Sequence, residues 1–201
     1  MDNLAKFCKN KEEYVSEVGK IVNNLLIAIG EDIKREGLKD TPKRVAKMYR
    51  EILKGYCEEE KPKITVFSND ENYNEMIIDE GYMYSLCEHH MLPFFGKVFV
   101  AYIPDKKIIG ISKLARIVDH FAAKLQVQER LTKQIAEYLN EVLQPKGVAV
   151  LMSCRHLCRE LRGIKKLNAI MTTTELLGCF KEDSKTRAEF MGLVRSRNNS
   201  Y

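Results

Sequence analysis

The sequence predicts an α+β protein, with an antiparallel sheet that carries helices on one face and an N-terminal helical extension before it. Three observations predict this class. Two helical apolar patterns occur before residue 60, segments rich in β-branched and aromatic residues recur after residue 75, and two further helical patterns lie between those segments. Strand pairs that alternate with helix pairs are typical of a sheet covered on one side. We expect residues 1–60 to form the extension and residues 61–201 the domain that carries the chemistry.

The composition limits the class of protein further. The 201 residues, 45% of them hydrophobic, are enough for one well-buried core. No apolar run approaches the roughly 18 residues that a membrane span needs, and the polar N-terminus does not resemble an export signal. We therefore expect a cytoplasmic protein with no membrane partner, whose six cysteines do not form a disulfide framework. The net charge of +5 is a small excess spread among acidic residues, which argues against a nucleic-acid partner.

The extension is predicted from apolar spacing and helix ends. Residues 12–29 place apolar side chains at helical intervals, and Gly30 ends that helix. Thr41 is expected to offer a capping hydroxyl before Pro42, which suits the first position of a second helix. The apolar stripe of this second helix stops at Gly55.

Beyond the extension, turn residues and periodicity divide the chain into a linker, strands and helices. Residues 61–74 have turn-forming residues and no sustained period, which predicts a linker. β-Branched and aromatic residues between turn signals then predict strands. The predicted strands span residues 76–86, 96–103, 108–111, 147–158 and 169–176, and the predicted helices between them span residues 112–125 and 128–142.

Three of the four histidines lie close to cysteines, in a Cys-Glu-His-His motif at residues 87–90 and a His-Leu-Cys motif at residues 156–158. Thiolate and imidazole are preferred zinc ligands, and a catalytic zinc takes three protein ligands and leaves a position for water. In an extended strand Cys154, His156 and Cys158 would share one face, so the spacing leaves Cys2His, Cys2His2 and Cys3His sets open. The alternative is that these side chains are satisfied core residues.

Charged residues near two helix starts suggest an anion site and a base-recognition site. Ser112 is expected to cap the helix that follows residue 111, with Lys113 and Arg116 one turn apart, an arrangement that suits phosphate oxygens. Arg162 could add a third cation, although such residues are more often solvated surface. Glu129, next to Gln128 at the start of the following helix, is a carboxylate able to accept from the edge of guanine.

Along most of its length the chain resembles the GTP cyclohydrolase I family. The stretches that carry the resemblance are residues 35–45, Ser85-Leu86-Cys87-Glu88-His89-His90-Met91-Leu92-Pro93-Phe94-Phe95-Gly96, residues 110–118, residues 126–132, His156-Leu157-Cys158 and residues 186–190. The sequence departs from the commonest pattern at Lys166–Met171 and at Arg159, which puts contacts made there in doubt.

The resemblance implies a zinc ion bound by Cys87, His90 and Cys158, and GTP as the substrate. It implies proton transfer by His89 and His156, with Ser112 as a helper. It also implies a triphosphate site formed by Ser112, Lys113, Arg116 and Arg162. It implies a guanine site formed by Gln128 and Glu129.

The fold implied is the tunnelling fold, in which α+β subunits join their sheets into a barrel and share active sites, here as a homodecamer built from pentamers. The reaction implied is hydrolytic opening of the guanine imidazole ring of GTP by zinc-activated water, with release of formate to give 7,8-dihydroneopterin triphosphate. One rival hypothesis is a related hydrolase that stops at the formylated intermediate or uses iron. A second is the nitrile reductase of queuosine synthesis, which would keep the sheet topology but use a nucleophilic Cys with nicotinamide, and no stretch resembles its cofactor motif. A third is a binding module in which four protein ligands make the zinc purely structural.

Overall fold

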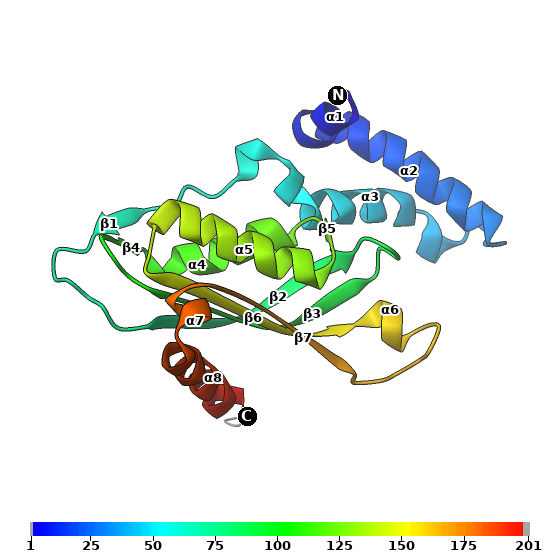
Figure 1. The fold of residues 1–201 in the computed structure, drawn as a ribbon. Coiled ribbons are helices and arrows are strands. Elements are labelled where there is room, and N and C mark those ends of the chain that lie inside the picture. Colours follow the sequence, from blue (N-terminus) through cyan, green and yellow to red (C-terminus); the bar gives the residue numbers. More distant parts are fainter. Residues whose placement is uncertain (1, 199–201) are drawn as a thin grey trace. The chain divides into compact units, whose positions relative to one another are not determined.

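The computed structural model describes residues 2–198, which form two compact units, one ending at Lys61 and the other beginning at Pro62. The first unit is helical (Figure 1). It contains α1 (Asp2–Lys9), α2 (Lys11–Ala28), η1 (Glu36–Leu38), α3 (Thr41–Ile52), η2 (Lys54–Tyr56) and η3 (Glu58–Glu60), of which η1 to η3 are 3₁₀ turns. Helices α2 and α3 correspond to the two helices expected from apolar spacing.

The cap predicted for α3 is wrong. The residue before the helix is Asp40, and no side chain caps it. Thr41 already belongs to the helix, and its hydroxyl donates to the carbonyl of Gly37 at 3.4 Å. The first turn of α2, in contrast, is capped by Asn10, whose side chain accepts from the backbone N–H of Glu13 at 3.2 Å.

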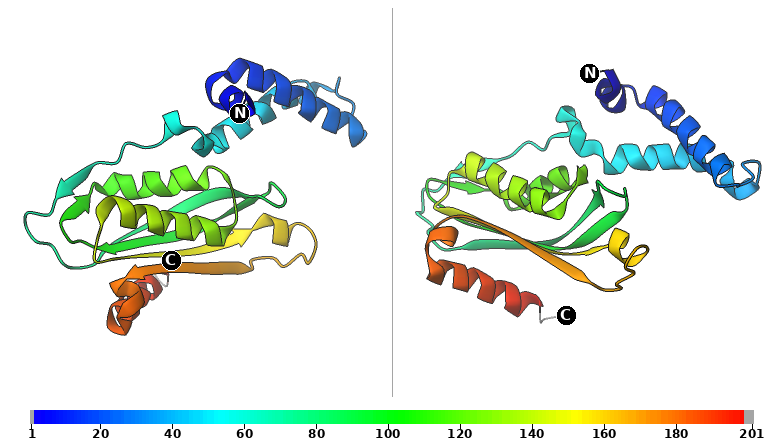
Figure 2. Two further views of the ribbon diagram at one scale, coloured as in Figure 1. Left: turned by 45° about the horizontal axis from the view of Figure 1, so that its top comes forward. Right: turned by 45° about the vertical axis from the view of Figure 1, so that its right-hand side comes forward.

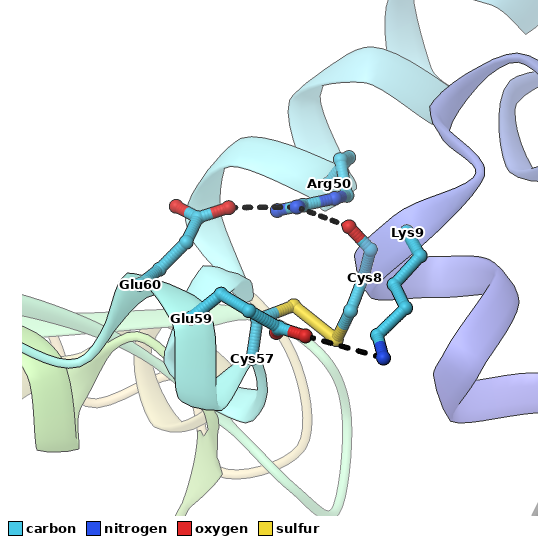
Figure 3. The surroundings of a disulfide bond; sticks show 6 residues. All are labelled: Cys8, Lys9, Arg50, Cys57, Glu59 and Glu60. Carbon is cyan, nitrogen blue, oxygen red and sulfur yellow. Dashed lines mark hydrogen bonds and ion pairs between the residues drawn. A yellow bond between two sulfur atoms is a disulfide. The ribbon is translucent and has the colours of Figure 1, made fainter.

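A disulfide joins Cys8 to Cys57 within the first unit (Figure 3). The two Cα atoms lie 5.4 Å apart although 49 positions separate the residues, so sequence spacing gave no sign of the pair. Beside the disulfide, the buried guanidinium of Arg50 donates to the carbonyl of Cys8 at 3.3 Å and to the carboxylate of Glu60 at 2.7 Å. The sequence argued against a disulfide framework, and this one pair departs from that expectation. The other four cysteines are free thiols: Cys87, Cys154, Cys158 and Cys179.

The second unit is built on a five-stranded mixed sheet with the order β5-β2-β3-β6-β7. Its strands are β2 (Ile77–Cys87), β3 (Pro93–Ile103), β5 (Leu125–Gln126), β6 (Gly147–His156) and β7 (Ile170–Gly178). The four long strands pair antiparallel, as expected, whereas the two-residue β5 pairs parallel to the end of β2. β5 is too short to give a sequence signal. The expected linker also contains a short strand, β1 (Val66–Ser68), which pairs with β4 (Lys107–Ile109).

Helices cover both faces of this sheet (Figures 1 and 2). One face packs against α4 (Ile111–Ala122) and α5 (Gln128–Leu143), which were expected, and forms the larger core. On the other face Phe99 and Leu151 pack with Phe180 of α7 (Cys179–Glu182) and Phe190 of α8 (Ser184–Asn198). The prediction of helices on one face is therefore incomplete, because the central strands β3 and β6 are apolar on both sides.

One histidine outside the motifs at residues 87–90 and 156–158 is largely buried. His120 of α4 is 9% exposed, and its ring lies 5.4 Å from that of Phe121. Across residues 2–198, no helix combines the length and the apolar character that a membrane span requires.

Candidate functional site

The structure brings together three donor side chains at one end of the sheet. Cys87 ends β2, His90 lies in the turn that follows, and Cys158 lies in the short helix α6 (Leu157–Glu160) directly after β6. Their ligand atoms all lie within 4.8 Å of one another. Two backbone hydrogen bonds close the turn, from Cys87 to the carbonyl of Leu92 at 2.9 Å and from Met91 to the carbonyl of Cys87 at 2.8 Å. This turn leads into β3, and because β3 pairs with β6, the segment after β6 that carries Cys158 lies beside the turn.

The chemistry of this donor group suits a transition metal. Two sulfurs and one imidazole are ligands that zinc prefers, and three protein ligands leave a position for water or substrate. Burial, with the neighbouring Cys87 thiol adding to it, raises the pKa of Cys158, so a metal would have to displace that proton to bind. Arg162 hydrogen bonds to Nε2 of His90, which places a guanidinium beside the group.

Cys154 lies outside this group. Its side chain is fully buried, its Sγ lies 3.6 Å from the sulfur of Met83, and burial raises its pKa to about 12. The strand ends at His156, so the alternation that would align Cys154 with Cys158 does not continue. Among the described residues the donor group therefore has three members, two cysteines and one histidine.

His156 lies at the end of β6, held between an aromatic ring and an amide. The ring of Phe94, its cross-strand partner, stacks on it with centroids 4.7 Å apart and an interplanar angle of 2°. Its Nε2 lies 2.8 Å from Oε1 of Gln128. Burial lowers the pKa of His156, the Glu129 carboxylate opposes that shift, and Arg159 adds to it. The neutral imidazole is thus favoured, although a carboxylate close by can support the charged form.

His89 lies on the exposed side of the donor group. Its Nδ1 lies 3.7 Å from Sγ of Cys87. The adjacent Glu88 forms an ion pair with Arg130, and Arg130 also donates to Oε1 of Gln126 at 2.9 Å. This network ties the turn to the start of α5.

Gln128 and Glu129 occupy different environments, although both were expected to contact guanine. Glu129 is exposed near His156. Gln128 is only 1% exposed, and both ends of its amide are engaged with partners inside the chain. The structure therefore gives Gln128 partners other than a bound base.

The residues expected at the triphosphate do not gather in one place. Gly110 precedes α4 and no side chain caps it, so Ser112 is not the cap that was predicted. Ser112 lines a cavity of about 280 Å³ together with residues 79–82 at the start of β2. Gly81 and Cys87 are six residues apart on that strand, which corresponds to roughly 20 Å.

Lys113 and Arg116 lie on the same first turns of α4 as Ser112. Arg162, in contrast, lies at the donor group, against His90. Within one chain, Ser112 thus lies beside the start of β2, whereas Cys87 ends that strand and Arg162 lies at the donor group.

Sequence reasoning missed two residues at this site, Phe94 and Arg130. Phe94 contacts His156 only because β3 and β6 pair in one particular register, which the sequence does not reveal. Arg130 lies one turn after Gln126 and could have been noticed as a cation near the motif at residues 87–90, but its ion pair depends on the fold.

Comparisons with known proteins agree on one family. The family model described as GTP cyclohydrolase I matches residues 18–195. A GTP cyclohydrolase 1 from Sulfurihydrogenibium sp. is 50% identical over 182 residues, which cover 90% of this chain and 95% of that protein. A GTP cyclohydrolase 1 from Coxiella burnetii is 51% identical over 175 residues, which cover 87% of this chain and 95% of that protein.

Among solved structures, the archaeosine synthase QueF-Like in the apo form matches at 17% identity with a TM-score of 0.42, over 51% of this chain and 93% of that chain. This likeness is too low to support an inference.

Proposed function

The chain belongs to the GTP cyclohydrolase I family, and we propose that it opens the imidazole ring of the guanine of GTP by hydrolysis, releases formate and yields 7,8-dihydroneopterin triphosphate. This reaction is the first step of tetrahydrofolate or pterin biosynthesis. The observation that supports it most directly is the cluster of Cys87, His90 and Cys158 with His156 two residues from one of its members. A donor group of three protein ligands is typical of a hydrolytic metal site, which keeps a position open for water.

Cys87, His90 and Cys158 would hold a zinc ion. Their donor types and mutual distances of at most 4.8 Å fit such an ion. When bound, zinc supplies Lewis-acid activation of water at neutral pH. Because Arg162 donates to Nε2 of His90, which has one lone pair, the guanidinium would have to move away before that nitrogen could bind a metal.

His156 would carry the proton that the imidazole nitrogen of the base needs when the ring opens. It is half-buried and stacked on Phe94, so its ring has a fixed plane, and the exposed Glu129 lies close enough to influence its charge. His89, exposed beside Cys87, would serve as a second proton carrier, with Ser112 as a helper.

Glu129 would read the guanine edge, because an exposed carboxylate can accept from both the ring N–H and the exocyclic amine. Lys113, Arg116 and Arg162, with Ser112, would hold the triphosphate. Ser112 lies beside residues 79–82 at the start of β2, and the strand from Gly81 to Cys87 spans roughly 20 Å, which supports a site completed by a neighbouring copy.

We therefore also propose self-association, as a homodecamer built from pentamers in which sheets join into a barrel. The last strand, β7, pairs only with β6 within the described residues, and β2 carries the exposed Tyr82 and Tyr84, at 66% and 72%. Free edges and exposed aromatic side chains on a sheet favour association. Light scattering of the purified protein would give the mass of the assembly, and a monomer would count against shared sites.

The test of the proposed reaction is formate release from GTP by the purified protein, with and without prior chelation, together with a mass spectrum of the product. Formate that disappears on chelation and returns with zinc, with the mass of 7,8-dihydroneopterin triphosphate, is the expected result. Metal-loaded protein that yields the formylated, ring-opened compound would identify a partial hydrolase instead. Metal-loaded protein that leaves GTP intact would refute the proposal.

A further inference from the structure

Gln128 is buried beside His156, and its amide group can adopt only one orientation. Its side-chain nitrogen lies 3.2 Å from the backbone carbonyl of Met152 and 3.1 Å from that of Met171. Carbonyl oxygens only accept hydrogen bonds, so the NH2 of the amide must face them. The amide oxygen therefore faces Nε2 of His156, 2.8 Å away.

Two threonines reinforce this orientation. The hydroxyl of Thr132 donates to the backbone carbonyl of Gln128 at 2.8 Å. The proton of Thr132 is thereby used, so in its 2.7 Å hydrogen bond with Thr132 the hydroxyl of Thr173 must be the donor. The oxygen of Thr173 is left to accept from the amide nitrogen of Gln128, 3.0 Å away. If the amide were reversed, its oxygen would face three other acceptors, the carbonyls of Met152 and Met171 and the hydroxyl oxygen of Thr173.

From this arrangement we infer that Gln128 is a positioning residue, which holds His156 as the tautomer protonated at Nε2. An amide oxygen can only accept, so Nε2 must donate to it. Nδ1 is then the atom of the ring that exchanges a proton with the substrate, and the stacked Phe94 keeps the ring in plane. This inference rests on the role proposed above for His156, and it assigns Gln128 to His156 instead of to guanine.

The contact with Met171 falls in a segment where the sequence departs from the common family pattern. Met171 contributes its backbone carbonyl, which any residue at this position would offer. The antiparallel pairing of β6 with β7, including Cys154 with Met171, fixes where that carbonyl lies. The departure therefore leaves this contact intact.

Kinetics of the metal-loaded enzyme test the inference. Gln128→Met has a similar length and lacks both the acceptor and the donors. It is expected to lower kcat about 10- to 100-fold, with the KM for GTP changed less than about two-fold. Gln134→Met on the same helix is the matched control, since Gln134 is half-buried and accepts from Gln126 without contacting His156. It should leave both constants within about two-fold of wild type.

A double-mutant cycle separates positioning from general stability. If Gln128 acts through His156, Gln128→Met should add no further loss to the residual kcat of His156→Ala, measured at high enzyme concentration. An equal loss in both backgrounds would overturn the inference. So would a raised KM with unchanged kcat, which would return Gln128 to base recognition.

Nitrogen NMR of wild-type protein labelled at histidine tests the tautomer without any activity and without depending on a folded variant at Gln128. The chain has four histidines, and the spectrum of His156→Ala would assign the signals of His156. At alkaline pH, where imidazole is neutral, we expect His156 to carry its proton on Nε2. A proton on Nδ1 would refute the inference. A protein that leaves GTP intact but shows the Nε2 tautomer would refute the proposed function alone.

Discussion

Replacing Phe94 by leucine would test whether the stacked ring matters to the chemistry or only to the core. Phe94 is fully buried on β3 and stacks on His156. Phe99 provides a matched control, because it is also fully buried on β3 but belongs to the core on the opposite face of the sheet. Both substitutions remove the same atoms from a packed environment.

The expected difference in stability follows from the stacking contact. Each Phe→Leu change should cost about 1–3 kcal/mol in the free energy of unfolding. An aromatic pair contributes about 0.5–1.5 kcal/mol beyond area burial, and only Phe94 has such a partner at the site. Phe94→Leu should therefore be the more destabilising of the two by about that amount. Urea unfolding followed by circular dichroism measures both values.

Activity should separate the two variants more sharply than stability does. Without the stacked ring the plane of His156 is less restricted, and we expect kcat for formate release to fall about ten-fold in Phe94→Leu, equivalent to about 1.4 kcal/mol in the barrier. Phe99→Leu should stay within about two-fold of wild type once rates are corrected for the folded fraction. Equal losses in the two variants, or wild-type kcat in Phe94→Leu, would refute the assignment of the ring to His156.

Three further outcomes are expected. A Cβ at Gly96 would lie 2.1 Å from a backbone oxygen of β6, so Gly96→Ala should disrupt the β3–β6 pair and lower Tm sharply. An unchanged melting curve would contradict the observed register of β3 against β6. His156→Ala should keep zinc but lose turnover, and Cys158→Ala should lose both zinc and turnover. Metal analysis and the formate assay measure these two quantities. Equal zinc loss in both variants would contradict the assignment of Cys158 as a ligand and of His156 as a proton carrier. Hydrogen bonds from the side chain and backbone of Thr186 and from the backbone of Lys185 lower the pKa of the Asp183 carboxyl. The stabilisation that Asp183 gives to the fold is therefore present above the unfolded pKa of about 3.9 and is lost as pH falls through the lower folded pKa. The Tm difference between wild type and Asp183→Ala should shrink over that acidic range.

Much of the fold could be predicted because its main elements are long and periodic. The four long strands and the helices α2 to α5 follow apolar spacing and turn residues, and their observed bounds differ from the expected ones by a few residues. Helix α8 was missed because, among residues 184–197, only Phe190 and Val194 are buried, too few to make an apolar stripe. The covered second face had one sequence signal, the near-continuous apolar runs of β3 and β6, which are typical of strands buried on both sides.

The candidate site was less predictable, because its geometry depends on chain turns and strand register. Residue types and family resemblance singled out the motifs at residues 87–90 and 156–158, but strand alternation wrongly suggested that Cys154 could align with Cys158. The change from strand to helix after His156 breaks that alternation. Gln128 appeared as a polar residue at a helix start, and only the packing of α5 against β6 and β7 shows that its amide faces inward.

The disulfide between Cys8 and Cys57 makes part of the first unit a covalent ring. The two cysteines are 49 positions apart, and Cys57 lies four residues before the boundary at Lys61. A single protease cut anywhere between the two cysteines would therefore leave the chain in one piece until a reductant is added. The same cut would release a fragment immediately if the thiols were free. Gel mobility after limited digestion, compared with and without reductant, would thus report whether these two cysteines are paired in the purified protein.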